Sequence, residues 1–181
     1  MQFQERRKAV RMATLERQRG KGEGMNEEKE FSATTANKEQ VVMRYCATGK
    51  DPSYSNAFAA GLDLPLMNEE GLTLGSGEHG VAYTGISVEL PEGTFGLVAI
   101  RSGLGMKGLV LSNGIGVIDE DYRGEIRIPL FYHGEGTLTL AKGERVAQMI
   151  VVPYLQPTLQ KTETLSQTSR GKDGFGSSGR F

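Results

Sequence analysis

SNGIGVIDEDYRGEI, residues 112–126, joins a glycine-spaced apolar segment at 114–118 to an acidic turn at 119–121. The residues beyond the turn, 125–130, alternate polar and apolar side chains, which is typical of a half-buried strand. The run therefore predicts a β-hairpin whose arms are 114–118 and 125–130. Its glycines leave the first arm bare, so a flat ligand can lie against main-chain N–H and C=O groups with a carboxylate beside it. The alternative is a glycine-bent hairpin with a solvated acidic turn.

Strand candidates recur at short spacing on both sides of this run, with turn residues between them. They lie at 40–45, 57–65, 81–85, 86–90, 95–100, 138–140 and 141–152. Because helical periodicity is confined to the N-terminal arm, the pattern favours an all-β sandwich or barrel. Residues 75–80 match the dinucleotide pattern G-x-G-x-x-G, but a strand rather than a helix follows them. We interpret this match as a hairpin turn.

Composition indicates a globular domain with a tail. The 181 residues are 38% hydrophobic and 24% charged, and no run approaches the roughly 18 apolar residues of a membrane span. The N-terminus lacks a signal-peptide core, so we expect a cytoplasmic location and no membrane partner. The single cysteine, Cys46, excludes an internal disulfide, and only two histidines accompany it, which argues against a zinc site built by the protein. We expect any metal to be magnesium brought in on phosphates.

The N-terminal arm is basic and the rest of the chain is acidic. Residues 1–24 hold seven Lys or Arg against three Glu, whereas the remainder holds 14 against 19. An unstructured, solvated arm is favoured over a nucleic-acid-binding one, because no binding module is recognisable. As a hypothesis, the natural start is Met25. We expect a charged extension at 1–38, a β domain at 39–164 and a flexible glycine-rich segment at 165–181.

Four further features have residue types suited to binding. The guanidinium, hydroxyl and backbone N–H groups of 101–108 can converge on phosphate oxygens, although a flexible loop with a surface cation is the alternative. Asp63 stands between two leucines and either faces water or is buried with partners. Gln148 interrupts an apolar strand and needs hydrogen-bond partners if it is buried. The segment 169–181 has a disordered composition, yet its aromatic and cationic residues could close over a phosphate-bearing ligand.

Five stretches, in this order, resemble the five motifs of the trimeric all-β dUTP diphosphatases, the dUTPases. They are 60–64, 101–104, Asn113 with 116–125, 143–150 and 170–179. Any one of them is a weak signal, whereas five ordered matches are specific. The resemblance implies a jelly-roll-like distorted β-barrel and a homotrimer with shared active sites. It also implies hydrolysis of dUTP to dUMP and pyrophosphate, which limits uracil incorporation into DNA and supplies dUMP for thymidylate synthesis.

On the nucleoside side, the resemblance makes Asp119 the general base that deprotonates the water attacking the α-phosphorus. Tyr122 would lie under the deoxyribose and leave no room for a 2′-hydroxyl, so that UTP is rejected. The main chain near Arg127 would close one side of the uracil pocket. The backbone that reads the edge of uracil would come from Asn113, Gly116, Val117 and Ile118.

On the phosphate side, the resemblance implies a cradle with a magnesium ion held by phosphates and waters, and with no direct protein ligand. The cradle would be Arg101, Ser102 and Gly103, with Gln148 near the metal's waters and Asp63 in support. In the tail, which would cross to a neighbouring chain, Arg170 would hold the γ-phosphate and Phe175 would stack on uracil. The remaining tail contacts would come from Gly176, Ser177 and Ser178.

Three departures from the family pattern stand out. Ile100 precedes the Arg-Ser-Gly, Asp173 replaces a glycine in the tail, and the segment from Arg101 to Asn113 is short, as in viral members. A carboxylate at 173 would repel a triphosphate unless it faces water. The short segment predicts a phage-encoded enzyme acting in the host cytoplasm. The alternatives are a dCTP deaminase of the same fold and a catalytically silent, trimeric nucleotide-binding protein.

Overall fold

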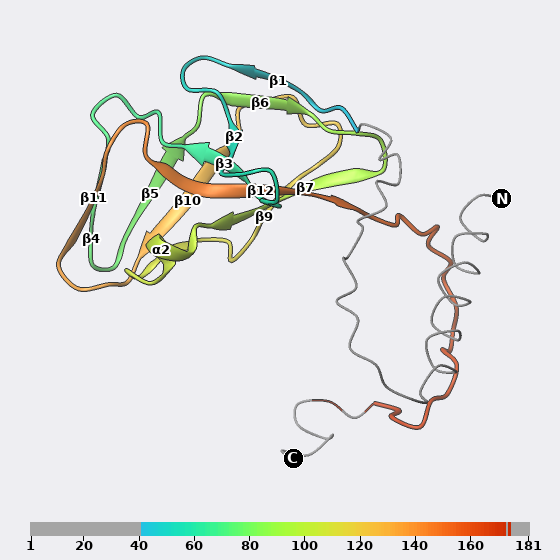
Figure 1. Cartoon of the computed structure of the whole chain (residues 1–181). Helices are drawn as coiled ribbons and strands as arrows, with labels where there is room; N and C mark the ends of the chain where they lie inside the picture. Colours follow the sequence, from blue (N-terminus) through green and yellow to red (C-terminus); the bar gives the residue numbers. More distant parts are fainter. Residues whose placement is uncertain (1–40, 173, 175–181) are drawn as a thin grey trace, which may run out of the picture. The chain divides into compact units, whose positions relative to one another are not determined.

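Residues 40–181 form one unit of the chain, of which the computed structural model describes residues 41–172 and 174 (Figure 1). Short strands alternate with turns through the described part. The strands are β1 (Arg44–Ala47), β2 (Ser53–Tyr54), β3 (Leu62–Pro65), β4 (Leu72–Gly75), β5 (Glu78–Tyr83), β6 (Ile86–Glu89), β7 (Thr94–Ile100), β8 (Leu109–Leu111), β9 (Gly116–Ile118), β10 (Arg127–Tyr132), β11 (Thr137–Leu140) and β12 (Arg145–Pro153). Among the described residues there is one helix, the single turn α2 (Ser102–Gly105).

The strands pair antiparallel in four sheets. The largest has the order β2-β3-β12-β7-β9, and a three-stranded sheet has the order β5-β10-β8. Two two-stranded sheets, β1-β6 and β11-β4, complete the arrangement. Figure 1 shows β12 beside β7 and β10 beside β5, which are the two longest contacts between strands. The all-β prediction is confirmed.

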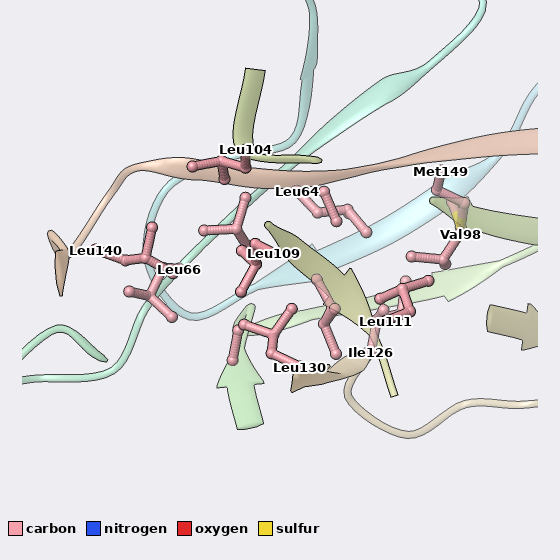
Figure 2. Packing of buried hydrophobic residues seen from close by; sticks show 14 of the residues in the cluster. Leu64, Leu66, Val98, Leu104, Leu109, Leu111, Ile126, Leu130, Leu140 and Met149 are labelled. Carbon is pink, nitrogen blue, oxygen red and sulfur yellow. The ribbon is translucent and has the colours of Figure 1, made fainter. Parts of the chain in front are cut away.

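One hydrophobic cluster fills the space between the sheets (Figure 2). Side chains on one face of each strand enter it, as the period of two requires. β3 is buried along its whole length, so its polar members need partners inside the protein. Burial of each leucine in the cluster contributes about 1.5–3 kcal/mol. Fully buried members include Leu64, Leu66, Leu109, Ile126 and Leu130.

The predicted hairpin of residues 112–126 is wrong in its pairing. Both arms are extended, but β9 pairs with β7, placing Gly116 opposite Val98 and Ile118 opposite Gly96. β10 pairs instead with β5 and β8. Gly114, at a φ of 77°, makes the turn after β8 and donates its N–H to the carbonyl of Leu111 at 3.0 Å, and the chain then enters the other sheet. Alternation identified the strands but carried no information about their partners.

Two other predicted strands exist but have different bounds, and the glycine pattern is a turn between strands as predicted. The run at 75–80 contains the end of β4, a turn at 76–77 with Gly77 at a φ of 82°, and the start of β5, so no helix follows its glycines. The strand predicted at 57–65 is shorter than expected, because only Leu62–Pro65 is extended and the residues before it form a loop. The strand at 40–45 begins at Arg44. No helix among the described residues has the length and hydrophobicity needed to cross a membrane.

Candidate active site

β9 delivers Asp119 to the rim of a hollow of about 590 Å³. The chain turns at once, because the N–H of Tyr122 donates to the carbonyl of Asp119 at 3.1 Å. Asp119 is exposed and shares the hollow with Val117, Phe95 and Tyr154. β9 is also the last strand of its sheet, so one edge of its backbone has no strand partner among the described residues. A carboxylate therefore stands at the end of an open main-chain edge, as the sequence predicted.

Tyr122 is held over the glycine two residues beyond it. A Cβ on Gly124 would lie 2.5 Å from the Tyr122 hydroxyl oxygen, so the ring fits because residue 124 has no side chain. The Tyr122 hydroxyl donates to the carbonyl of Glu125 at 3.0 Å. The ring remains partly exposed, at 42%. It therefore offers a fixed, accessible aromatic face close to Asp119.

Arg127 starts β10 and is fixed by two partners. Its Nε lies 3.5 Å from Glu125 Oε2, and its guanidinium carbon is 5.5 Å from the centre of the Tyr83 ring. Glu125 accepts a hydrogen bond from the N–H of Gly85 at 2.8 Å. The side chain of Arg127 is still 63% exposed, and its main chain stands opposite Tyr83 in the ladder that joins β10 to β5.

A second hollow, of about 930 Å³, gathers the residues predicted to hold phosphate. Arg101 directly follows β7, Ser102 and Gly103 begin α2, and Gln148 lies on β12. The segment after Arg101 forms a helical turn, because the Arg101 carbonyl accepts from the N–H groups of Leu104 and Gly105, each at 3.0 Å. Leu104 is buried and ties this turn to the core. The cradle residues are therefore displayed from packed elements.

Asp63 is buried at 4% exposure and ion-paired, which decides between the two alternatives that the sequence left open. Its Oδ1 lies 3.0 Å from Arg101 Nε, and its Oδ2 accepts from Arg145 at 2.9 Å. Such charge-assisted contacts satisfy a carboxylate that burial would otherwise penalise. Arg101 is consequently fixed rather than a free surface cation.

A β-bulge in β12 explains why Arg145 and Gln148 both line this hollow. Residues three apart on a regular strand point to opposite faces. The register of β12 against β3 shifts between Arg145 and Ala147, which adds one residue and returns Gln148 to the face of Arg145. Gln148 also packs closely on Gly61, since a Cβ at that glycine would lie 3.0 Å from the Cβ of Gln148.

The two hollows lie at opposite ends of β7. Asp119 follows Ile118, the partner of Gly96, whereas Arg101 stands five residues beyond Gly96 along β7. Asp119 is therefore level with Phe95, six residues before Arg101, and at about 3.3 Å per residue the two positions are about 20 Å apart. A single chain therefore does not bring the predicted base and the predicted cradle onto one α-phosphate.

Known proteins share the sequence motifs of this chain. The family model described as dUTPase matches residues 47–179. The chain belongs to the dUTPase family. A deoxyuridine 5'-triphosphate nucleotidohydrolase of Azotobacter vinelandii is 44% identical over 130 residues, covering 71% of this chain and 86% of that protein. Its namesake in Rickettsia bellii is 42% identical over 134 residues, covering 74% and 89%.

Solved structures of phage dUTPases share the fold. The dUTPase of Staphylococcus bacteriophage 80alpha with dUPNHPP is 29% identical with a TM-score of 0.69, covering 76% of this chain and 98% of that one. A mutant dUTPase from phage phi11 of S. aureus, whose structure shows a structural Mg(II) ion, is 24% identical with a TM-score of 0.62, covering 68% and 97%. The predicted dUTPase resemblance is confirmed, while phage origin and location in the host cytoplasm stay predictions.

The last dUTPase motif falls largely beyond the described residues. Arg170 lies in an exposed segment without strands and borders neither hollow. The other tail residues assigned a role, and the departure at Asp173, lie outside the described part; they are Asp173, Phe175, Gly176, Ser177 and Ser178. Arg145, in contrast, was missed: it lies within the fourth motif, but its partner Asp63 is 82 residues away in the sequence.

Proposed function

We propose that this chain hydrolyses dUTP to dUMP and pyrophosphate, with Asp119 as the general base for water attack on the α-phosphorus. The observation that carries the proposal is the exposed Asp119 carboxylate at the end of the open edge of β9. The membership of the chain in the dUTPase family supports it. A carboxylate within reach of one water takes the proton as the bond to phosphorus forms. The reaction keeps uracil out of DNA and supplies dUMP for thymidylate synthesis.

The nucleoside lies along β9 in this proposal. The unpaired N–H and C=O groups at the outer edge of that strand suit the donors and acceptors of uracil, in the manner of a pairing base. Alternate residues of the segment Gly116, Val117 and Ile118 direct these groups outward, Asn113 lies in the preceding turn, and the main chain at Arg127 closes the far side. Tyr122, packed on Gly124, lies under the deoxyribose and excludes a 2′-hydroxyl.

The triphosphate lies in the larger hollow. Arg101 and Ser102 donate to phosphate oxygens, and Gly103 leaves room for a close approach. Arg170 takes the γ-phosphate, Phe175 covers the base, and the residues that complete the closure are Gly176, Ser177 and Ser178. The reaction depends on positioning the triphosphate and neutralising its charge. The proposed site therefore has many hydrogen-bond donors to phosphate and a single general base, Asp119.

The residues present fit a magnesium ion that arrives with the substrate. Asp63, the buried carboxylate in the hollow, is already engaged by two arginines, and the described residues contain no group of three His, Cys, Asp or Glu side chains arranged to hold a metal. The amide oxygen of Gln148 can accept from a metal-bound water. Bound Mg²⁺ would neutralise charge on the phosphates.

The active site is completed between chains of a homotrimer. The separation of about 20 Å along the β7 direction between Asp119 and Arg101 supports this, because it is too long for both residues of one chain to meet one α-phosphate. A closed symmetric oligomer repeats any such contact between chains and so builds one site at each interface. Asp119 of one chain then faces the cradle of a neighbour, and the tail crosses to a neighbouring site.

Of the alternatives, the deaminase is disfavoured because Gly103 and Leu104 follow the Arg-Ser pair where that chemistry needs a second arginine. A silent binding protein is disfavoured because Asp119 is exposed and next to the aromatic Tyr122, which a pure binder would not require.

Pyrophosphate release from dUTP with magnesium tests the proposal. The wild-type chain should turn over dUTP and release no ammonia from dCTP. Asp119→Asn should lose about 10²–10⁴-fold in kcat, the range for a positioned general base. A chain ending before Arg170 should keep its fold and lose most activity. An inactive wild type, or an Asp119→Asn variant with full kcat, would overturn the assignment.

A further inference from the structure

Glu120, which follows the predicted base, is tied to two segments distant in sequence. Its Oε2 accepts from the N–H of Gly93 at 2.7 Å and from the hydroxyl of Tyr154 at 3.3 Å. Gly93 lies in the turn before β7, and Tyr154 directly follows β12. One carboxylate oxygen therefore joins the acidic turn to both neighbouring segments.

The two segments that Glu120 holds are also bound to each other. The N–H of Tyr154 donates to the carbonyl of Gly93 at 3.1 Å. The Tyr154 ring packs edge-on against Phe95, with ring centres 6.3 Å apart and planes at 73°. The Glu120 carboxylate thus binds a corner of the sheet, formed by Gly93, Phe95 and Tyr154, whose residues also contact one another.

Burial and the negative charge of Glu120, followed by the hydrogen bond to Glu120, raise the pKa of Tyr154 above its usual value of about 10. Asp119 and Asp121 add smaller contributions in the same direction. The Tyr154 hydroxyl is therefore protonated at neutral pH and can donate a hydrogen bond to Glu120. Asp119 and Tyr154 line the same hollow, so the Asp119 carboxylate lies near this corner.

Asp119 depends on its neighbours for its position. It opens the turn that the Tyr122 N–H closes, and Glu120 is the next residue of that turn. The carbonyl of Glu120 also accepts from Arg123 at 2.7 Å, so both ends of this residue are fixed. Within the described part of the chain, no hydrogen bond reaches the Asp119 carboxylate itself. The Asp119 carboxylate therefore takes its position from its backbone, which the Tyr122 N–H holds directly and which the contacts of Glu120 anchor further.

We propose that Glu120 is a positioning residue, whose carboxylate clamps the acidic turn to Gly93 and Tyr154 and so fixes Asp119 relative to the substrate. The proposal rests on the proposed function of Asp119. A displacement of about 1 Å at a reacting group costs up to about 10²-fold in rate, so a clamp of this kind acts on kcat rather than on substrate binding.

Steady-state kinetics of three variants test the clamp. Glu120→Ala should lower kcat about 10- to 100-fold and change KM less than about threefold. Glu120→Gln keeps an acceptor oxygen for both donors and should return kcat to within about threefold of wild type. Glu92→Ala, an exposed carboxylate beside Gly93, is the matched control and should leave kcat unchanged. Equal losses in Glu120→Gln and Glu120→Ala, or an unchanged kcat in Glu120→Ala, would overturn the proposal.

A phenol titration tests the clamp without any activity. The absorbance change of Tyr154 on ionisation is obtained as wild type minus Tyr154→Phe. Its midpoint should fall toward about 10 when the same difference is taken in the Glu120→Ala background. An unmoved midpoint would overturn the contact even if dUTP is hydrolysed, whereas a shifted midpoint in an inactive protein would count only against the proposed function. If Glu120→Ala does not fold, Tyr154→Phe removes one donor and should lower kcat about two- to fivefold; an unchanged kcat there overturns the clamp.

Discussion

Gln148 stands directly opposite Asp63 across the ladder that joins β12 to β3. Asp63 in turn holds Arg101 and Arg145, so one buried carboxylate organises a wall of the larger hollow. The donors on this wall point into the hollow because the carboxylate behind them fixes their direction. The predictions that follow test this wall, the aromatic face near Asp119 and the assembly of the site between chains.

Asp63→Asn should weaken both the fold and substrate binding. The amide cannot pair with two guanidinium groups, and the expected loss in free energy of unfolding is about 1–3 kcal/mol, moderated because both arginines are partly exposed. KM for dUTP should rise about tenfold, which corresponds to ~1.4 kcal/mol. Denaturant unfolding and steady-state kinetics measure the two effects. The control is Glu69→Gln, which breaks the exposed 2.6 Å pair with Lys142 and should stay within about 0.5 kcal/mol of wild type.

Gly61→Ala should displace Gln148 while leaving the fold intact. The new Cβ would lie 3.0 Å from the Cβ of Gln148, and the flexible end of that side chain must move away. KM for dUTP should rise about three- to tenfold, because one polar contact to phosphate or metal-bound water is lost. Gly75→Ala is the matched control, since its Cβ would meet no atom closer than 3.4 Å. Equal KM values for the two variants would contradict the assigned role of Gln148.

Gly124→Ala should relax the discrimination between dUTP and UTP. The added methyl group collides with the Tyr122 ring, which must leave the position that we propose lies under the sugar. The ratio of kcat/KM for dUTP to that for UTP should fall about tenfold or more. Tyr122→Phe keeps the ring and removes the 3.0 Å hydrogen bond to Glu125, so its ratio should stay within about threefold. A normal ratio in Gly124→Ala would remove Tyr122 from the specificity site.

Mixing two inactive variants should restore activity. If Asp119 and Arg101 of one site come from different chains, trimers formed from equal amounts of Asp119→Asn and Arg101→Gln contain about one quarter intact sites. Pyrophosphate release is measured before and after the two proteins are refolded together. Each variant refolded alone is the control. Persistent inactivity of well-formed mixed trimers would place both residues of a site on the same chain.

The strands were largely predictable because their signals are local. Alternation marked β10, apolar runs next to turn residues marked β7 and β12, and glycine-rich turns such as that in 75–80 marked the ends of strands. The pairing of strands was not predictable in the same way. β9 joins β7 rather than β10, because long-range packing chooses the partner of each strand.

The sequence suggested members for the candidate site, which remain predictions, but it did not indicate their geometry. The burial of Asp63 depends on Arg145, 82 residues away in the sequence, and the facing of Gln148 depends on a bulge that leaves no mark in the alternation of β12. The anchoring of Glu120 was also hidden, since Gly93 and Tyr154 reach it only through the fold. Residue types therefore suggested the chemistry, whereas the partners of each side chain became visible only in the folded structure.

Asp119 and Arg101 lie far apart within one chain, so under the proposed assembly a chain can fold before it is active. A newly synthesised chain can complete its core and both of its hollows as a first-order process. Under the proposed assembly, activity then appears in a later step whose rate rises with chain concentration. Refolding followed by fluorescence and by turnover should therefore show a lag in turnover that shortens on concentrating the protein. Freshly made chains would carry no activity toward nucleotides until enough of them have accumulated to meet.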